Sequence, residues 1–179
     1  MFNSDVLDRV AVGVDLANAR DRGLLPGTTI DRPSWIFEAH GFLPPARATD
    51  WRALTLVAEG VAQLLRLVAA GEHQTAVTRV NQELSARAVT PFVEACDDTW
   101  VLHLHAPDVH FADGWATGLA AALAISYSTD DAHRVGCCAA QGCAALFLDR
   151  GRNRQRLYCS LLCQNRSKSR GYRHRRSRR

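Results

Sequence analysis

Apolar residues recur every three or four positions through most of the chain before residue 130, which is the spacing of one buried face of an α-helix. The clearest pattern covers residues 50–70, where Thr49 or Asp50 can cap the first turn and Gly71 follows the last. Its apolar positions are Trp51, Leu54, Ala58, Val61, Leu64, Leu65 and Val68. The same spacing predicts further helices over residues 5–20, 34–40, 74–87 and 111–128. Helices 50–70 and 74–87 should pack as an antiparallel pair, because the link between them is short.

Two short segments show the residue types and the alternation of β-strands instead. They cover residues 91–93 and 100–105 and flank a turn at Asp97 and Asp98. Pro26-Gly27 and Pro44-Pro45 mark loops between the helices. The expected fold class is therefore α+β and mostly α, with a helical N-terminal domain that includes a short β-hairpin.

Charge is distributed very unevenly along the chain. Residues 150–179 hold twelve Lys and Arg and no Asp or Glu, so all 18 acidic residues lie before them with only ten basic ones. The two parts carry +12 and −8, which gives the net charge of +4. Such an uneven charge distribution is typical of a protein whose basic part binds a polyanion. A disordered basic tail that only aids solubility would give the same distribution.

Motifs of membrane proteins, secreted proteins and common enzymes are absent from the sequence. No apolar run approaches the ~20 residues that span a bilayer, and the first residues lack the pattern of a signal peptide, so we expect a cytoplasmic protein. There is no glycine-rich phosphate loop, nucleophile elbow or HExxH motif, so we do not expect an enzyme. His103, His105 and His110 would form either a metal site or a polar strand face.

Five of the six cysteines lie in the C-terminal part, and four of them form two closely spaced pairs. Cys138-x4-Cys143 and Cys159-x3-Cys163 are fifteen residues apart, so each pair can supply half of a tetrahedral zinc site. A reducing compartment favours metal binding over disulfides. Cys137 is an alternative to Cys138 in the first pair, but we assign the ligands as Cys138, Cys143, Cys159 and Cys163.

The residues between the two pairs predict a hairpin that brings the pairs together. Residues 145–148 have the pattern of a strand, 149–153 that of a turn and 156–158 that of a returning strand. Ser160 can then cap a helix that carries Cys163 in its first turn. A knuckle, a hairpin and a helix around one ion make a treble-clef-like finger. Four thiolate ligands leave no open position, so we expect one structural Zn²⁺.

The finger carries a recognisable set of motifs. The run Cys159-Ser160-Leu161-Leu162-Cys163-Gln164-Asn165-Arg166-Ser167-Lys168 follows Cys138-x4-Cys143 and Phe147-Leu148-Asp149. In these motifs the chain resembles the CGNR zinc-finger proteins, a bacterial family. The resemblance implies a helical N-terminal domain, often called ABATE, and a role as a stress-induced transcription regulator. Weaker similarity extends to Val14-Asp15-Leu16-Ala17-Asn18, Val80-Asn81-Gln82-Glu83-Leu84 and Trp100-Val101-Leu102.

The chain departs from the family pattern at three positions. Gln164 stands where the family has glycine, Tyr158 where tryptophan is usual, and Ala58 where the long helix often has arginine. Glutamine is a good helix former, so the first change should not break the finger. The change at Ala58 removes whatever function that arginine has in the family.

Basic residues follow both the turn and the helix of the expected finger. Eight of them are candidates for contacts with nucleic acid: Arg150, Arg152, Arg154, Arg156, Arg166, Lys168, Arg170 and Arg173. Arg166, Arg170 and Arg173 share one helix face, from which arginine can reach phosphates or guanine edges. Tyr158 and Tyr172 would either stack on bases or pack against the finger.

These patterns divide the chain into four parts. They are a helical ABATE-like domain at residues 1–130, a linker at 131–136, a zinc finger at 137–173 and a basic tail at 174–179. We predict a zinc-dependent transcription regulator whose partner is double-stranded DNA. The N-terminal domain would respond to a small-molecule signal or form a homodimer, and no membrane contact is expected.

Three alternatives remain open. An RNA- or ribosome-associated protein would prefer RNA over duplex DNA. A protein-interaction adapter would use the zinc only structurally, with a tail that binds acids non-specifically. Asp15 and Asn18 share a helix face, and a ligand-lined cavity around them and Asn81 would favour an enzyme.

Overall fold

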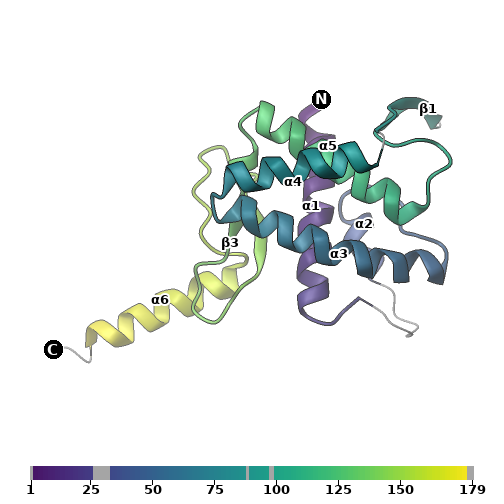
Figure 1. The fold of residues 1–179 in the computed structure, drawn as a ribbon. Helices are drawn as coiled ribbons and strands as arrows, with labels where there is room; N and C mark the ends of the chain where they lie inside the picture. Colours follow the sequence, from purple (N-terminus) through teal and green to yellow (C-terminus); the bar gives the residue numbers. More distant parts are fainter. Residues whose placement is uncertain (1, 26–32, 88, 97–98, 177–179) are drawn as a thin grey trace.

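The computed structural model describes residues 2–25, 33–87, 89–96 and 99–176, and it shows a mostly helical protein with two small antiparallel strand pairs (Figure 1). This confirms the expected fold class. The elements are α1 (Phe2–Asp21), α2 (Trp35–Glu38), α3 (Ala48–Ala69), α4 (His73–Ala86), β1 (Phe92–Cys96), β2 (Thr99–His103), α5 (Phe111–Ser128), η1 (Ala132–Arg134), β3 (Val135–Cys137), β4 (Leu146–Leu148) and α6 (Leu161–Arg176). The expected loop at Pro26-Gly27 and turn at Asp97 and Asp98 lie outside the described residues. No described helix is both long and apolar enough to cross a membrane.

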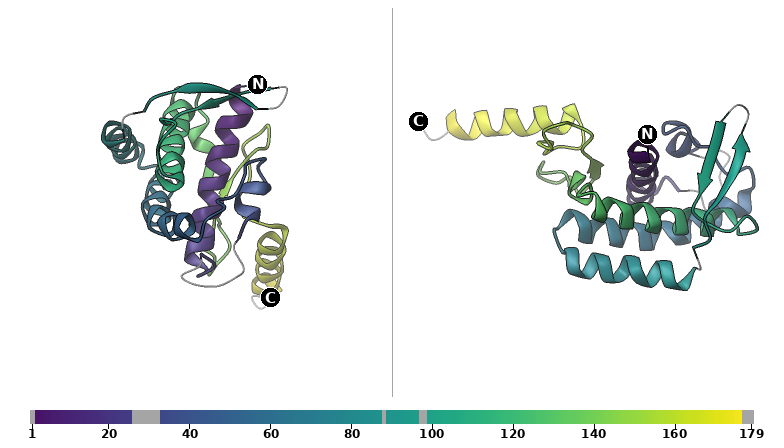
Figure 2. Two further views of the ribbon diagram at one scale, coloured as in Figure 1. Left: turned by 90° about the vertical axis from the view of Figure 1, so that its right-hand side faces the viewer. Right: turned by 90° about the horizontal axis from the view of Figure 1, so that it is seen from above.

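The central element is α1, which packs against α3 and α5 and also contacts α2 and β4 (Figure 2). Val6, Val10, Val14 and Ala17, which follow the three- and four-residue spacing, are buried, but so are Val12 and Leu16 on another side of the helix. Gly13 explains how closely α1 approaches α5: a Cβ there would lie 2.8 Å from a methyl carbon of Leu119. The helix is therefore buried more completely than a single apolar stripe predicts.

The expected antiparallel pair is formed by α3 and α4, with α5 packed against both (Figure 1). All seven apolar positions predicted for α3 are buried. Gly71 has a φ of +75°, which glycine adopts without strain, so the chain can reverse within the three residues between the helices. Ala58 is fully buried, so the position where the family often has arginine belongs to the core in this protein.

A second core surrounds the short helix α2. Phe37 is fully buried and meets the rings of Trp51, Phe111 and Trp115 edge to face, with centroids 5.8, 5.6 and 5.0 Å apart. Trp51 Nε1 donates to the carbonyl oxygen of Pro45 at 3.1 Å. These aromatic contacts join α2, α3 and the start of α5.

The β1–β2 hairpin lies at the opposite end of the molecule from α6 (Figures 1 and 2). Phe92 pairs with His103 and Val93 with Leu102, so alternate residues face the helices and the solvent. Trp100 lies on the outward face and is 76% exposed. The strand that was predicted to reach residue 105 ends at His103.

The pairing predicted inside the finger is wrong. Residues 156–158 do not form a strand, and β4 pairs instead with β3, which precedes the first cysteine pair: Val135 lies opposite Leu148 and Gly136 opposite Phe147. One reason is that the Asp149 carboxylate accepts the backbone N–H groups of Gly151 and Arg156, at 2.7 and 2.8 Å. A side chain thus closes the loop where the sequence indicates a β-turn.

The finger shares the main hydrophobic core with the helices. Val135, Leu146 and Leu148 are buried in the same cluster as side chains from α1, α3, α4 and α5. Residues 131–136, interpreted as a linker from the sequence, contain η1 and the first residues of β3, and Asp131 is only 4% exposed. The strand pair β3–β4 therefore packs directly on the helical part.

Candidate metal centre and nucleic-acid interface

The first cysteine pair lies in a tight knuckle that begins where β3 ends. Cys143 N donates to the Ala140 carbonyl at 2.9 Å, and Gly142 has a φ of +73°, so the chain reverses between Cys138 and Cys143. Cys138 N donates to the Ala145 carbonyl at 2.9 Å, which holds the knuckle against the residue before β4. Both thiols therefore face the same point.

The second pair lies at the N-terminus of α6. Ser160 Oγ accepts the backbone N–H of Cys163 at 3.2 Å, which confirms the predicted helix cap. Cys159 precedes the cap, and Cys163 lies in the first turn of the helix. This position suits a thiolate, because the free N–H groups of a helix N-terminus favour negative charge.

The four sulfur atoms lie within 4.8 Å of one another. Cys159 Sγ is 3.6 Å from Cys163 Sγ and 3.8 Å from Cys143 Sγ. A tetrahedral site with Zn–S bonds of ~2.3 Å requires neighbouring sulfurs to be about 3.8 Å apart. The arrangement therefore fits one zinc ion held by Cys138, Cys143, Cys159 and Cys163, as predicted. With all four positions taken by protein, this zinc is structural.

The thiols of the site have opposing pKa shifts. Burial raises the pKa of Cys138, but hydrogen bonds to its sulfur from the backbone N–H groups of Cys159 and Ala140 outweigh this and lower it to about 7. Burial and the neighbouring thiols raise the pKa of Cys159 to about 12. Zinc binds the thiolate form of cysteine, so a bound zinc ion would favour loss of the proton from the Cys159 thiol.

Cys137 and the N-terminal histidines lie outside this site. Cys137 is exposed, and the group of four cysteines excludes it. Within the described residues, the four cysteines are the one group of three or more ligands close enough to hold a metal, so His103, His105 and His110 do not form such a site. His103 stacks on Phe92 and pairs with Glu94 at 3.2 Å.

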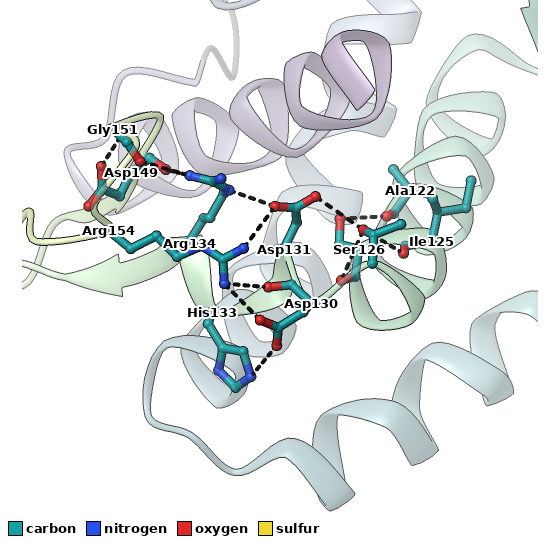
Figure 3. Close-up of polar contacts among 11 residues, drawn as sticks. Ala122, Ile125, Ser126, Asp130, Asp131, His133, Arg134, Asp149, Gly151 and Arg154 are labelled. Atoms are coloured by element: carbon teal, nitrogen blue, oxygen red, sulfur yellow. Dashed lines mark hydrogen bonds and ion pairs between the residues drawn. The ribbon is translucent and has the colours of Figure 1, made fainter. Parts of the chain in front are cut away.

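A polar cluster fastens the finger to the end of α5 (Figure 3). Arg134 Nε donates to the buried Asp131 carboxylate at 2.6 Å, and Arg134 Nη1 donates to the carbonyls of Asp149 and Gly151 at 3.1 and 3.0 Å. Arg154 Nη1 donates to the Asp130 carboxylate at 2.8 Å. Hydrogen bonds from two arginine side chains, and not strand pairing, thus hold the loop that follows β4.

Two contacts join the finger to α1. The Asn18 side chain binds both backbone groups of Leu146: Nδ2 donates to its carbonyl at 3.0 Å, and Oδ1 accepts its N–H at 2.9 Å. Asp8 pairs with Arg150 at 2.6 Å. Asp15 instead pairs with His40 at 2.8 Å, so Asp15 and Asn18 bind separate partners and Asn81 lies away on α4. The motif at residues 14–18 therefore serves packing and docking.

The structure sorts the predicted nucleic-acid contacts into two groups. Arg150 and Arg154 are paired with carboxylates, and Arg156 donates to the carbonyls of Tyr158 and Leu148 at 2.9 and 3.1 Å and lies over the Phe147 ring. Arg150 and Arg154 thus fasten the finger to the helical part, and Arg156 makes contacts within the finger.

The second group points outward. The side chains of Arg152, Lys168 and Arg170 are exposed and make no hydrogen bond or ion pair with any described residue. Among the described residues, the Arg166 side chain makes long contacts, at 3.4 Å to the Gln141 carbonyl and 3.8 Å to Cys163 Sγ. The side chain of Arg173 lies outside the described part of the chain.

Arg166 and Arg170 line a shallow groove of about 680 Å³ between the knuckle and α6. Tyr158 lies in its wall, and Ala139 and Gln141 form its other side. The groove thus combines two guanidinium groups with an aromatic ring, a set that can contact both phosphates and bases. The helix itself projects from the body and packs against none of the other major elements (Figure 1).

Sequence reasoning missed an apolar patch on the finger. Leu157, Leu161 and Leu162 are 61, 75 and 82% exposed. Leu161 and Leu162 follow Ser160 where a capped helix begins, and Leu157 lies in the segment that was predicted as a strand. Neither pattern distinguishes a buried face from an exposed one. Asn18 and Arg134 were also missed as docking residues, because each acts through backbone groups far away in the sequence.

The C-terminal part therefore has the architecture of a small zinc finger, formed by a knuckle, a short strand pair and a helix. The sequence model of the CGNR zinc finger family matches residues 134–176, which include β3, β4, all four ligands and α6. No curated protein matches the chain. The likeness of the N-terminal part to the ABATE domain remains a prediction.

Proposed function

We propose that the protein binds duplex DNA through α6 and the adjoining groove, and acts as a DNA-binding transcription regulator and not as an enzyme. The observation that carries the proposal is the group of unpaired cations at Arg152, Lys168 and Arg170, on and beside a projecting helix whose N-terminus holds two zinc ligands. The zinc fixes the direction of the helix, so its basic side chains are held ready before DNA arrives.

The size and charge of α6 suit the major groove of DNA, which is ≈ 12 Å wide and admits one helix. Arginine can form paired hydrogen bonds with guanine, and each phosphate contact adds sequence-independent affinity that falls as salt rises. The acidic N-terminal part lies on the other side of the finger and is not expected to touch DNA (Figure 2).

The proposal is tested by measuring affinity for a duplex across a salt series. Changing Lys168→Ala together with Arg170→Ala should weaken binding and reduce the salt slope by about two, since each lost phosphate contact removes about one. The matched control is Arg52→Ala with Arg79→Ala, which removes the same charge from α3 and α4. Equal losses in both variants would show that net charge alone drives binding, and stronger binding to RNA would favour an RNA-associated protein.

The patch of Leu157, Leu161 and Leu162 favours a second candidate, a protein-interaction adapter. Exposed apolar side chains next to a rigid zinc site are typical of a surface that contacts another protein. If the protein is an adapter, duplex binding should vanish at physiological salt. Leu162→Ser should then abolish a complex with another protein, and Lys168→Ala together with Arg170→Ala should leave that complex intact.

A further inference from the structure

A second concave site lies at the end of the molecule away from α6. It is a cavity of about 470 Å³ lined by residues of the β1–β2 hairpin, α1, α5 and the segment after α2. Figure 2 shows the hairpin beside α1 and α5. Ligand pockets in proteins are typically ≈ 300–1,000 Å³ and mostly apolar. The cavity shares no residue with the zinc centre or with the basic groove.

Arg9 places a cation in this cavity. The residue is only 9% exposed, and its guanidinium carbon lies 5.2 Å from the centre of the Phe42 ring and 5.8 Å from that of Trp115. Nη2 donates to the Leu102 carbonyl at 3.2 Å, and no carboxylate of a described residue lies within ion-pair distance. Burial lowers the pKa of Arg9, but arginine stays charged at neutral pH. The Asp5 carboxylate attracts this cation from beyond ion-pair distance. The nearly buried guanidinium thus has no direct ion pair with a described residue, and an anion in the cavity would supply one.

The other walls are mainly apolar. Trp115, Phe111 and Phe42 present aromatic rings, and Val101 and Val109 add aliphatic surface. Glu94 is the one carboxylate in the lining; its side chain is 62% exposed at the rim and pairs with His103 at 3.2 Å. The interior thus offers one arginine among rings, and the carboxylate of Glu94 lies at the solvent-exposed rim.

We propose that this cavity binds a small aromatic carboxylate, with the carboxylate paired to Arg9 and the ring packed against Trp115 and Phe111. A planar guanidinium matches a carboxylate with two parallel hydrogen bonds. A phosphate dianion would leave a second charge uncompensated among the rings, and an aliphatic acid would lack the ring contacts that the aromatic walls favour. This proposal is independent of DNA binding, because binding of the acid to the cavity is measured without nucleic acid.

The test is calorimetric titration of the zinc-loaded full chain with benzoate, phenylacetate and indole-3-acetate. Each acid is compared with its neutral amide, which has nearly the same shape but no charge. We expect at least one acid to bind at least tenfold more tightly than its amide. No binding of any acid, or equal binding of acid and amide, would overturn the proposal.

Three variants locate the site. Val101→Phe fills the cavity from β2, whereas Val93→Phe adds the same ring to the exposed face of β1. Binding should fall at least tenfold in the first variant and stay unchanged in the second. Arg9→Met should remove the preference for acid over amide. If Arg9→Met does not fold, the Val101 and Val93 pair still decides: equal binding in both variants would place the acid elsewhere and overturn the proposal.

Discussion

Cys137 and Cys138 are adjacent in the chain but have opposite surroundings. Cys138 is buried, and its sulfur accepts the backbone N–H of Cys159 at 3.3 Å. Cys137 is exposed at the end of β3. Because successive side chains of a strand point to opposite sides, a shift of one position turns the thiol away from the metal.

This difference predicts the effect of single serine substitutions on zinc content. Cys138→Ser should reduce bound zinc from one ion per chain to a small fraction, because a neutral hydroxyl is a poor replacement for a thiolate ligand. Metal analysis of the purified protein measures it. Cys137→Ser is the matched control and should keep one zinc; loss of zinc in this variant alone would contradict the ligand assignment.

At the same scale, the ligands were predictable from sequence and the residues that support them were not. Two cysteine pairs at metal-binding spacing point to zinc without knowledge of the fold. Asp149 accepts two backbone N–H groups and Asn18 binds both backbone groups of Leu146. Both residues lie in motifs that resemble the family, but a motif does not indicate which backbone groups a side chain binds, because that depends on which segments meet in space.

At the scale of elements, periodicity located the helices and the short link predicted the α3–α4 pair, but the strand pairing in the finger was not predicted. The pattern at residues 111–128 matches α5, and the stripe of α3 is buried as predicted. The strand at 145–148 was also found, yet its partner is β3 and not residues 156–158. A short apolar run indicates a strand, whereas the choice of partner was decided by the core that Val135 and Leu148 share with the helices.

The crossing of α1 and α5 predicts a strong effect at Gly13. Gly13→Val should destabilise the protein by about 1–3 kcal/mol, because the new side chain overlaps the buried Leu119 methyl groups. Urea unfolding followed by circular dichroism measures the free energy of unfolding. Gly60→Val is the matched control, since a Cβ on Gly60 meets nothing within 4 Å. Equal destabilisation of both variants would contradict the close crossing.

At the scale of the whole molecule, the finger is held by two kinds of contact. Its strands β3 and β4 share the hydrophobic core of the helices, and Asp131, Arg134 and Asp149 add a polar cluster beside it (Figure 3). The knuckle and the start of α6 depend instead on the zinc. The finger therefore has two parts: β3 and β4 are stabilised by packing, and the knuckle and the start of α6 are stabilised by the metal.

Removing zinc should unfold only the second part. In the presence of a chelator, trypsin should cut rapidly after Arg156 and Arg166, because metal binding supplies the folding free energy of the knuckle and of the start of α6. The helices α1, α3, α4 and α5 should remain, so most of the helical circular dichroism signal should persist. Mass spectrometry of the fragments with and without chelator measures the change; the same cleavage rate in both would contradict a structural role for the zinc.

In the proposed function, zinc holds α6 in place to read duplex DNA. Selection from a random duplex library with zinc-loaded protein at physiological salt tests this. We expect an enriched consensus sequence that is lost when Arg166 and Arg170 are both changed to alanine, while the Cys137→Ser variant recovers the same consensus. Pools without enrichment, from a protein that still carries one zinc per chain, would contradict it.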